Sequence, residues 1–137
     1  MAHQRRRVLC AEPHADTCSL LTEMLEQHGH EVVSAQSIHQ CLELAAEREF
    51  DIYMLDDRYI DGDSLELCRR LRAATPQTPI LFFSAQAFAR DRQRAMEAGA
   101  RAYFIKPGDI FEIVQAVNSI LAHGAARRGN AHEVERP

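Results

Sequence analysis

Short apolar runs alternate with longer amphipathic runs five times along the chain. The apolar runs are of the length expected for strands, and the nearly unbroken ones indicate strands covered on both faces. The longer runs carry apolar residues at intervals of three and four, which is the spacing of one helical face. We therefore predict five strands, at Val8–Ala11, Glu31–Ala35, Asp51–Leu55, Ile80–Phe83 and Ala102–Ile105.

Residues at the ends of the amphipathic runs mark where the helices begin and end. A first helix starts near Asp16 and stops at Gly29, a residue that suits the left-handed position after a helix. Ser37 and Gln40 have the spacing of a capping box and open the second helix. The third helix is predicted to begin after Asp63 or Ser64, the fourth to cover 90–98, and the fifth to run from Asp109 to Gly124. The fourth has the thinnest apolar stripe.

Strands that alternate with helices at this spacing predict right-handed crossovers and a parallel sheet with helices on both faces. Five strands in about 120 residues fit a flavodoxin-like doubly wound α/β fold with strand order 2-1-3-4-5. We expect residues 1–123 to form this domain. Residues 124–137 have no apolar period and are predicted to be a flexible tail.

Composition and charge narrow the class of protein. The 137 residues are 46% hydrophobic and 26% charged, with a formal net charge of −4, whereas a dedicated nucleic-acid binder is usually basic. No apolar run approaches the about 20 residues of a membrane span or forms a signal peptide, so we expect a cytoplasmic protein. The four cysteines form no CxxC pair, which favours reduced thiols over a metal or disulfide framework.

Polar side chains follow four of the five predicted strands. They are Glu12, Asp56, Ser84 and Lys106, after the first, third, fourth and fifth strands. Doubly wound sheets bind ligands at the carboxyl ends of their strands, near the switch point between the first and third strands. Two acids, a hydroxyl and a cation suit phosphoryl transfer, because they supply a nucleophile, cation ligands and groups that neutralise phosphoryl oxygens.

These residues and their spacing resemble the receiver domains of two-component response regulators. The resemblance spans residues 6–122 and includes the sequences DIYMLD, DGDSL, FFSA and AGARAYFIKP. It implies that Asp56 is the phospho-acceptor and that Ser84 and Lys106 act on the phosphoryl group. It also implies that Tyr103 is an aromatic switch residue that moves together with Ser84.

The resemblance further implies an Mg²⁺ ion held by Glu12, the acceptor aspartate and the backbone carbonyl of Arg58. Pro13 stands where the family usually has a second acid, and it offers neither charge nor N–H. We therefore expect Mg²⁺ to bind weakly. Glu12 is long enough to reach the ion directly, and Asp57 and His14 are further candidates. However, alternation along a strand would point Asp57 away, and a lone loop histidine is more often solvated.

The implied function is a signalling module in phosphorelay signal transduction. Asp56 would take a phosphoryl group from a histidine kinase or phosphotransfer protein, and the phosphoprotein would then present a changed protein-binding surface. A downstream protein or a second copy would bind the face of the fourth helix, fifth strand and fifth helix, with no direct contact to nucleic acid or membrane. Pro13 keeps an alternative open, a degenerate pseudo-receiver that binds proteins independently of phosphorylation.

Enzyme functions are disfavoured by two local sequences. Dehalogenase-like phosphohydrolases need an acid two residues after the nucleophile, where this chain has Arg58. A flavodoxin needs a phosphate loop rich in Ser, Thr and Gly after its first strand, and AEPHADT is not such a loop. We expect a signalling domain that at most takes part in its own phosphorylation and dephosphorylation.

Overall fold

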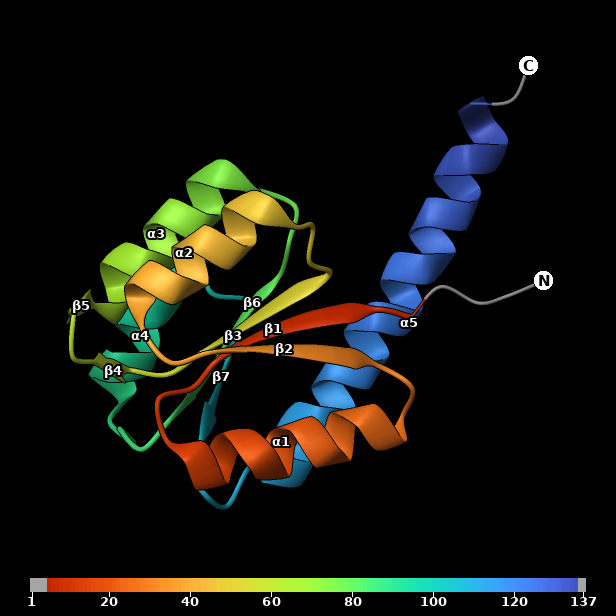
Figure 1. Cartoon of the computed structure of the whole chain (residues 1–137). Helices are drawn as coiled ribbons and strands as arrows, with labels where there is room; N and C mark the ends of the chain where they lie inside the picture. The colour runs from red at the N-terminus through yellow and green to blue at the C-terminus, as the bar shows by residue number, and fades with distance from the viewer. Residues whose placement is uncertain (1–4, 136–137) are drawn as a thin grey trace.

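A parallel five-stranded sheet forms the centre of the computed structural model, which describes the backbone of residues 5–135 and the side chains of residues 5–123. Its order is β2-β1-β3-β6-β7, so the predicted order 2-1-3-4-5 of the five long strands is confirmed (Figure 1). A two-stranded antiparallel ladder between β4 and β5 was not predicted. The strands are β1 (Arg7–Ala11), β2 (Glu31–Ala35), β3 (Ile52–Leu55), β4 (Arg58–Tyr59), β5 (Gly62–Asp63), β6 (Ile80–Ser84) and β7 (Ala102–Ile105).

The central strands are buried on both faces. Every residue of β3 and β6 is buried, as their unbroken apolar sequences predicted. Along β3, Tyr53 packs into one core cluster, whereas Ile52 and Met54 pack into the other. Since side chains alternate across a strand, each face of the sheet contributes to its own core.

Two helical layers cover the sheet. Helices α2, α3 and α4 lie on one face, and α1 and α5 lie on the other (Figure 1). Helix α4 buries only Ala95 among its own residues, in agreement with its thin apolar stripe. The helices are α1 (Ala15–Gln27), α2 (Ile38–Glu47), α3 (Ser64–Ala74), α4 (Ala89–Glu97) and α5 (Ile110–Glu135).

The helix ends follow the predicted local chemistry and add one contact between distant segments. Gly29 has a φ of 84° just beyond α1, and the Ser37 hydroxyl accepts a hydrogen bond from the Gln40 backbone N–H at 3.1 Å. Asp63 begins α3 by accepting from the Leu65 N–H at 2.9 Å. Asp61, from the loop after β3, accepts from the first two N–H groups of α2. The acidic loop therefore anchors α2, which local sequence did not indicate.

Helix α5 is longer than the sequence indicated. We predicted an end at Gly124, whereas the helical backbone continues to Glu135 and extends past the sheet (Figure 1). The added segment includes alanines and arginines, which are strong helix formers, and its two glycines, Gly124 and Gly129, each cost only about 1 kcal/mol inside a helix. Residues 136 and 137 of the predicted tail lie outside the described part, and its flexibility stays a prediction.

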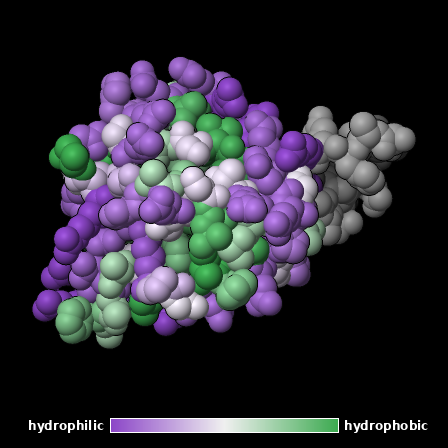
Figure 2. Space-filling view, turned by 60° about the horizontal axis from the view of Figure 1, so that its bottom comes forward, coloured by the Kyte–Doolittle hydropathy of each residue, from purple (hydrophilic) through white to green (hydrophobic). Residues whose placement is uncertain are grey.

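The surface is mostly hydrophilic. On the face in Figure 2, apolar residues gather in a band across the middle and are surrounded by hydrophilic ones. Within the described part of the chain, no helix combines the length and hydropathy needed to cross a bilayer.

Candidate functional site

Three of the predicted site residues converge at the carboxyl ends of the strands. Glu12 follows β1, Asp56 follows β3, and Lys106 follows β7. The Lys106 Nζ lies 2.7 Å from the Glu12 Oε1 and 3.3 Å from the Asp56 Oδ1. The two carboxylate side chains are 4% and 2% exposed, and that of Lys106 is 13% exposed. One ammonium group therefore bridges two buried carboxylates at the switch point of the sheet.

Asp56 is held in a crowded acidic environment. Burial raises the pKa of its carboxyl above the usual range, and the Asp57 and Glu12 carboxylates add to the rise. Burial also disfavours the Asp57 anion, but hydrogen bonds from Asp56 and Ser84 lower the pKa of Asp57. The expectation that Asp57 points away from Asp56 is therefore wrong. Strand β3 ends at Leu55, so the alternation of a strand no longer applies at residue 57.

Ser84 and Tyr103 meet at the loop after β6. Ser84 is fully buried, and its Oγ accepts a hydrogen bond from the Gln86 backbone N–H at 3.0 Å. The Tyr103 hydroxyl donates to the Gln86 carbonyl at 2.7 Å, and its ring stacks on Phe82 with centroids 5.9 Å apart. The two predicted switch residues thus bind the two backbone polar groups of Gln86, Ser84 its N–H and Tyr103 its carbonyl.

Arg58 lies on the short β4–β5 ladder, where it pairs with Asp63. Its side chain is exposed, with Nε 3.6 Å from the Asp57 Oδ2. The structure therefore places Arg58 next to the acidic cluster, and the role of its backbone carbonyl as a cation ligand stays a prediction.

Two residues of the site were missed or undervalued by sequence reasoning. The His14 Nδ1 lies 3.0 Å from the Glu12 Oε2 and 3.6 Å from the Asp56 Oδ2, although its side chain is 67% exposed. The hydroxyl of the half-buried Tyr59 donates to the Ala11 carbonyl at 2.6 Å and accepts from the Asp56 N–H at 2.9 Å. Tyr59 therefore joins the ends of β1 and β3. No local pattern marks this role, because it depends on a contact across 48 residues.

The acidic cluster has the donor set that a divalent cation requires. The Asp56 Oδ2 is buried and has no hydrogen-bond partner, and such an atom is costly unless something binds it. It lies with ligand atoms of Glu12 and His14 within a span of 4.8 Å. Carboxylate oxygens are the ligands that Mg²⁺ prefers, so these residues fit a cation at this place.

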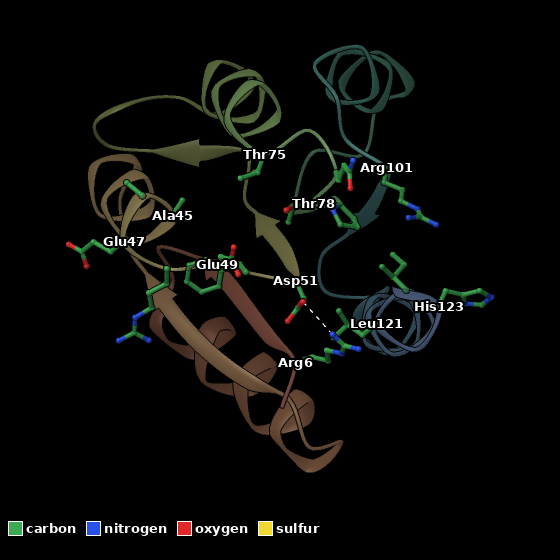
Figure 3. A pocket seen from close by; sticks show the side chains of 16 residues that line it. Arg6, Ala45, Glu47, Glu49, Asp51, Thr75, Thr78, Arg101, Leu121 and His123 are labelled. Atoms are coloured by element: carbon green, nitrogen blue, oxygen red, sulfur yellow. Dashed lines mark ion pairs between the residues drawn. The ribbon is translucent and has the colours of Figure 1, made fainter. Parts of the chain in front are cut away.

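A separate hollow of about 680 Å³ lies at the opposite edge of the sheet, by the amino ends of the strands (Figure 3). Two charged residues of its lining contact each other or the neighbouring strand. The Asp51 carboxylate lies 3.7 Å from the Arg6 Nη1, and it accepts a hydrogen bond from the Arg7 N–H at 2.8 Å. These contacts tie the start of β3 to β1, and the candidate site lies at the other end of the same strands.

Comparison with known proteins agrees with this arrangement. A family model described as "Response regulator receiver domain" matches residues 8–118. The transcriptional regulatory protein ZraR of Escherichia coli O157:H7 is 29% identical over 123 residues, which cover 90% of this chain and 28% of that protein. The transcriptional activator protein IrlR of Burkholderia pseudomallei is 34% identical, with coverage of 88% and 52%. The chain thus spans only part of these curated relatives.

Solved structures show the same fold. The non-phosphorylated HemR receiver domain from Leptospira biflexa has a TM-score of 0.78 and 30% identity, covering 85% of this chain and 94% of that one. A two-component response regulator from Clostridium difficile has a TM-score of 0.82 and 24% identity, with coverage of 86% and 97%.

Proposed function

This chain belongs to the response regulator receiver domain family of two-component signalling, and from that premise we propose that it accepts a phosphoryl group on Asp56. The observation that carries the proposal is the Asp56 carboxylate, buried at the end of β3, paired with Lys106 and left with one unpartnered oxygen. The phosphoryl donor is a histidine kinase or a phosphotransfer protein.

The transfer exchanges one bond for another. A lone pair of the Asp56 carboxylate attacks the phosphorus of a phosphohistidine, and a P–O bond forms as the P–N bond breaks. The electrons of the broken bond leave with the donor imidazole, which takes up a proton. The Lys106 ammonium, 3.3 Å from the Asp56 Oδ1, neutralises charge on the acyl phosphate. Glu12 and Asp56, with the Arg58 carbonyl, would hold a divalent cation, which would supply positive charge to the phosphoryl oxygens.

Intact mass spectrometry after incubation with acetyl phosphate tests this function. The wild-type chain is expected to gain the mass of one phosphoryl group when a divalent cation is present. Asp56→Asn should abolish the gain, whereas Asp57→Asn, which removes the neighbouring carboxylate, should retain it. An unchanged adduct on Asp56→Asn would overturn the assignment. A wild-type chain that forms no adduct with any divalent cation would instead support the phosphorylation-independent interaction module that Pro13 leaves open.

The output surface follows from the contacts of Gln86. Phosphorylation draws the Ser84 hydroxyl toward the phosphoryl group, which releases the Gln86 N–H and frees the loop that leads into α4. Helix α4 buries little of its own surface and so is easily repositioned. Phe88, at the start of α4, Met96 in α4 and Phe111 in α5 already expose apolar surface. A downstream protein or a second copy binds there, on the face of α4, β7 and α5.

Hydrogen exchange of the free and beryllofluoride-treated chain locates this surface. We expect the protection of backbone amides to change between Ser84 and Val117, because the Gln86 contacts and α4 lie in that segment. Val33→Ala, on β2 at the far edge of the sheet, serves as a control that should leave the pattern unchanged. Changes confined to α1 and α2 would contradict the proposed output face.

A further inference from the structure

Three ligand atoms of different residues face one another beyond the ends of β1 and β3. The His14 Nδ1 lies 3.0 Å from the Glu12 Oε2 and 3.6 Å from the Asp56 Oδ2. All three atoms lie within 4.8 Å of one another. The cluster therefore contains an imidazole nitrogen together with two carboxylate oxygens.

Lys106 binds one oxygen of each carboxylate and leaves the other oxygen of each on the side of His14. Its Nζ binds the Glu12 Oε1 and the Asp56 Oδ1, so that the second oxygen of each carboxylate remains for the side of His14. The Asp56 Oδ2 is buried without any hydrogen-bond partner. A buried polar atom in this state is costly unless a ligand satisfies it, so the atom itself indicates a missing ligand.

The backbone brings His14 back over the cluster. The His14 N–H donates to the Glu12 Oε2 at 3.0 Å, directly after a proline that has no N–H of its own. His14 precedes the first residue of α1 in an extended conformation, and its side chain makes no capping hydrogen bond. The His14 ring therefore does not cap α1. It lies beside the two carboxylates, next to Pro13, which offers no ligand.

We propose that Glu12, His14 and Asp56 bind a borderline transition-metal dication, of the chemical class of Zn²⁺ and Co²⁺, in preference to Mg²⁺. The inference rests on the proposed function in that it names the cation of the same site. Imidazole nitrogen favours Zn²⁺ and its neighbours in the first transition row, whereas Mg²⁺ favours oxygen ligands and retains its waters. The absence of a carboxylate at Pro13 weakens the binding of Mg²⁺. For a transition metal, the His14 nitrogen compensates for that missing ligand.

The two separations of the His14 nitrogen suit such an ion. Bonds of about 2.0–2.2 Å place neighbouring ligand atoms about 3.0 Å apart in an octahedral site and about 3.4 Å apart in a tetrahedral one. The His14 Nδ1 separations of 3.0 and 3.6 Å lie close to both values. The three ligand atoms lie within 4.8 Å of one another, so binding would draw the two carboxylate oxygens closer together. Binding would satisfy the Asp56 Oδ2, which has no hydrogen-bond partner.

Cation affinity of the unphosphorylated chain tests the proposal without any transfer step. Competition with a chromophoric chelator is expected to show that Zn²⁺ binds at least about 100-fold more tightly than Mg²⁺. His14→Ala should lower the affinity for Zn²⁺ by about 10- to 100-fold and leave the affinity for Mg²⁺ within about twofold of the wild-type value. Because His14 is exposed, this variant is expected to fold. His39→Ala, which removes an exposed histidine of α2, is the matched control and should change neither affinity.

Two further measurements separate the possible outcomes. Co²⁺ should give a visible absorption spectrum that His14→Ala alters and His39→Ala does not. Pro13→Asp should raise the Mg²⁺ affinity by about 10- to 100-fold, because it restores a carboxylate. Equal Zn²⁺ affinity of the wild type and His14→Ala, or an equal loss in His39→Ala, would overturn the proposal. A site that binds Zn²⁺ through His14 but forms no Asp56 adduct would overturn the proposed function alone.

Discussion

Replacing Lys106 with methionine is expected to lower the free energy of unfolding by about 3 kcal/mol near pH 7.5. The substitution removes the ammonium group that bridges the Glu12 and Asp56 carboxylates and leaves both of them buried without that partner. Breaking a buried ion pair on one side typically costs about 3–5 kcal/mol, and the partial exposure of Lys106 favours the low end of this range. Methionine keeps most of the apolar stem, so the loss reports on charge.

Urea denaturation at two pH values measures this effect. The loss should shrink as the pH falls below about 7, because burial raises the pKa of the Asp56 carboxyl to about 7 and the protonated carboxyl carries no charge. Arg92→Met, on the exposed surface of α4, is the control and should change stability by less than about 0.5 kcal/mol. A loss below about 1 kcal/mol near pH 7.5 would show that the bridge contributes little. Lys106 is the only lysine of the chain, so lysine-selective isotope labelling gives a single side-chain signal from this site.

Tyr59→Phe is expected to destabilise the fold by about 2–4 kcal/mol although it removes a single oxygen atom. That hydroxyl donates to the Ala11 carbonyl and accepts from the Asp56 N–H, at 2.6 and 2.9 Å. Each buried group left unsatisfied costs about 1–3 kcal/mol. The substitution also frees the backbone of Asp56, so the yield of acetyl phosphate adduct should fall in the same variant.

Tyr53→Phe provides a matched control on the neighbouring strand. The Tyr53 hydroxyl forms a hydrogen bond with the Thr75 side chain at 3.1 Å, and Thr75 also donates to the Leu71 carbonyl. Its removal should therefore cost no more than about 1 kcal/mol and leave the adduct yield unchanged. Equal losses of stability in the two variants would mean that the hydrogen bonds of Tyr59 between β1 and β3 contribute no more to stability than the hydrogen bond of Tyr53.

The architecture was predictable because it depends on patterns that are local in the chain. Unbroken apolar runs such as Ile80–Phe83 become central strands, since burial on both faces requires apolar side chains on both. Handed crossovers then leave few ways to order five parallel strands. The same rule brought Glu12, Asp56 and Lys106 to one edge, because the carboxyl ends of parallel strands coincide.

The finer arrangement of the site was decided only by the tertiary structure. The direction of a side chain beyond the end of a strand depends on the partners that packing brings close to it. In this protein, packing brings the Asp57 carboxylate close to Asp56 and Ser84. His14 and Tyr59 acquire their roles from contacts with residues more than 40 positions away, which no local periodicity records. Sequence patterns alone predicted the five long strands, their order and the residues at the sheet edge. Packing decided which atoms meet there, because hydrogen bonds act over about 3 Å whereas sequence patterns specify only faces and ends.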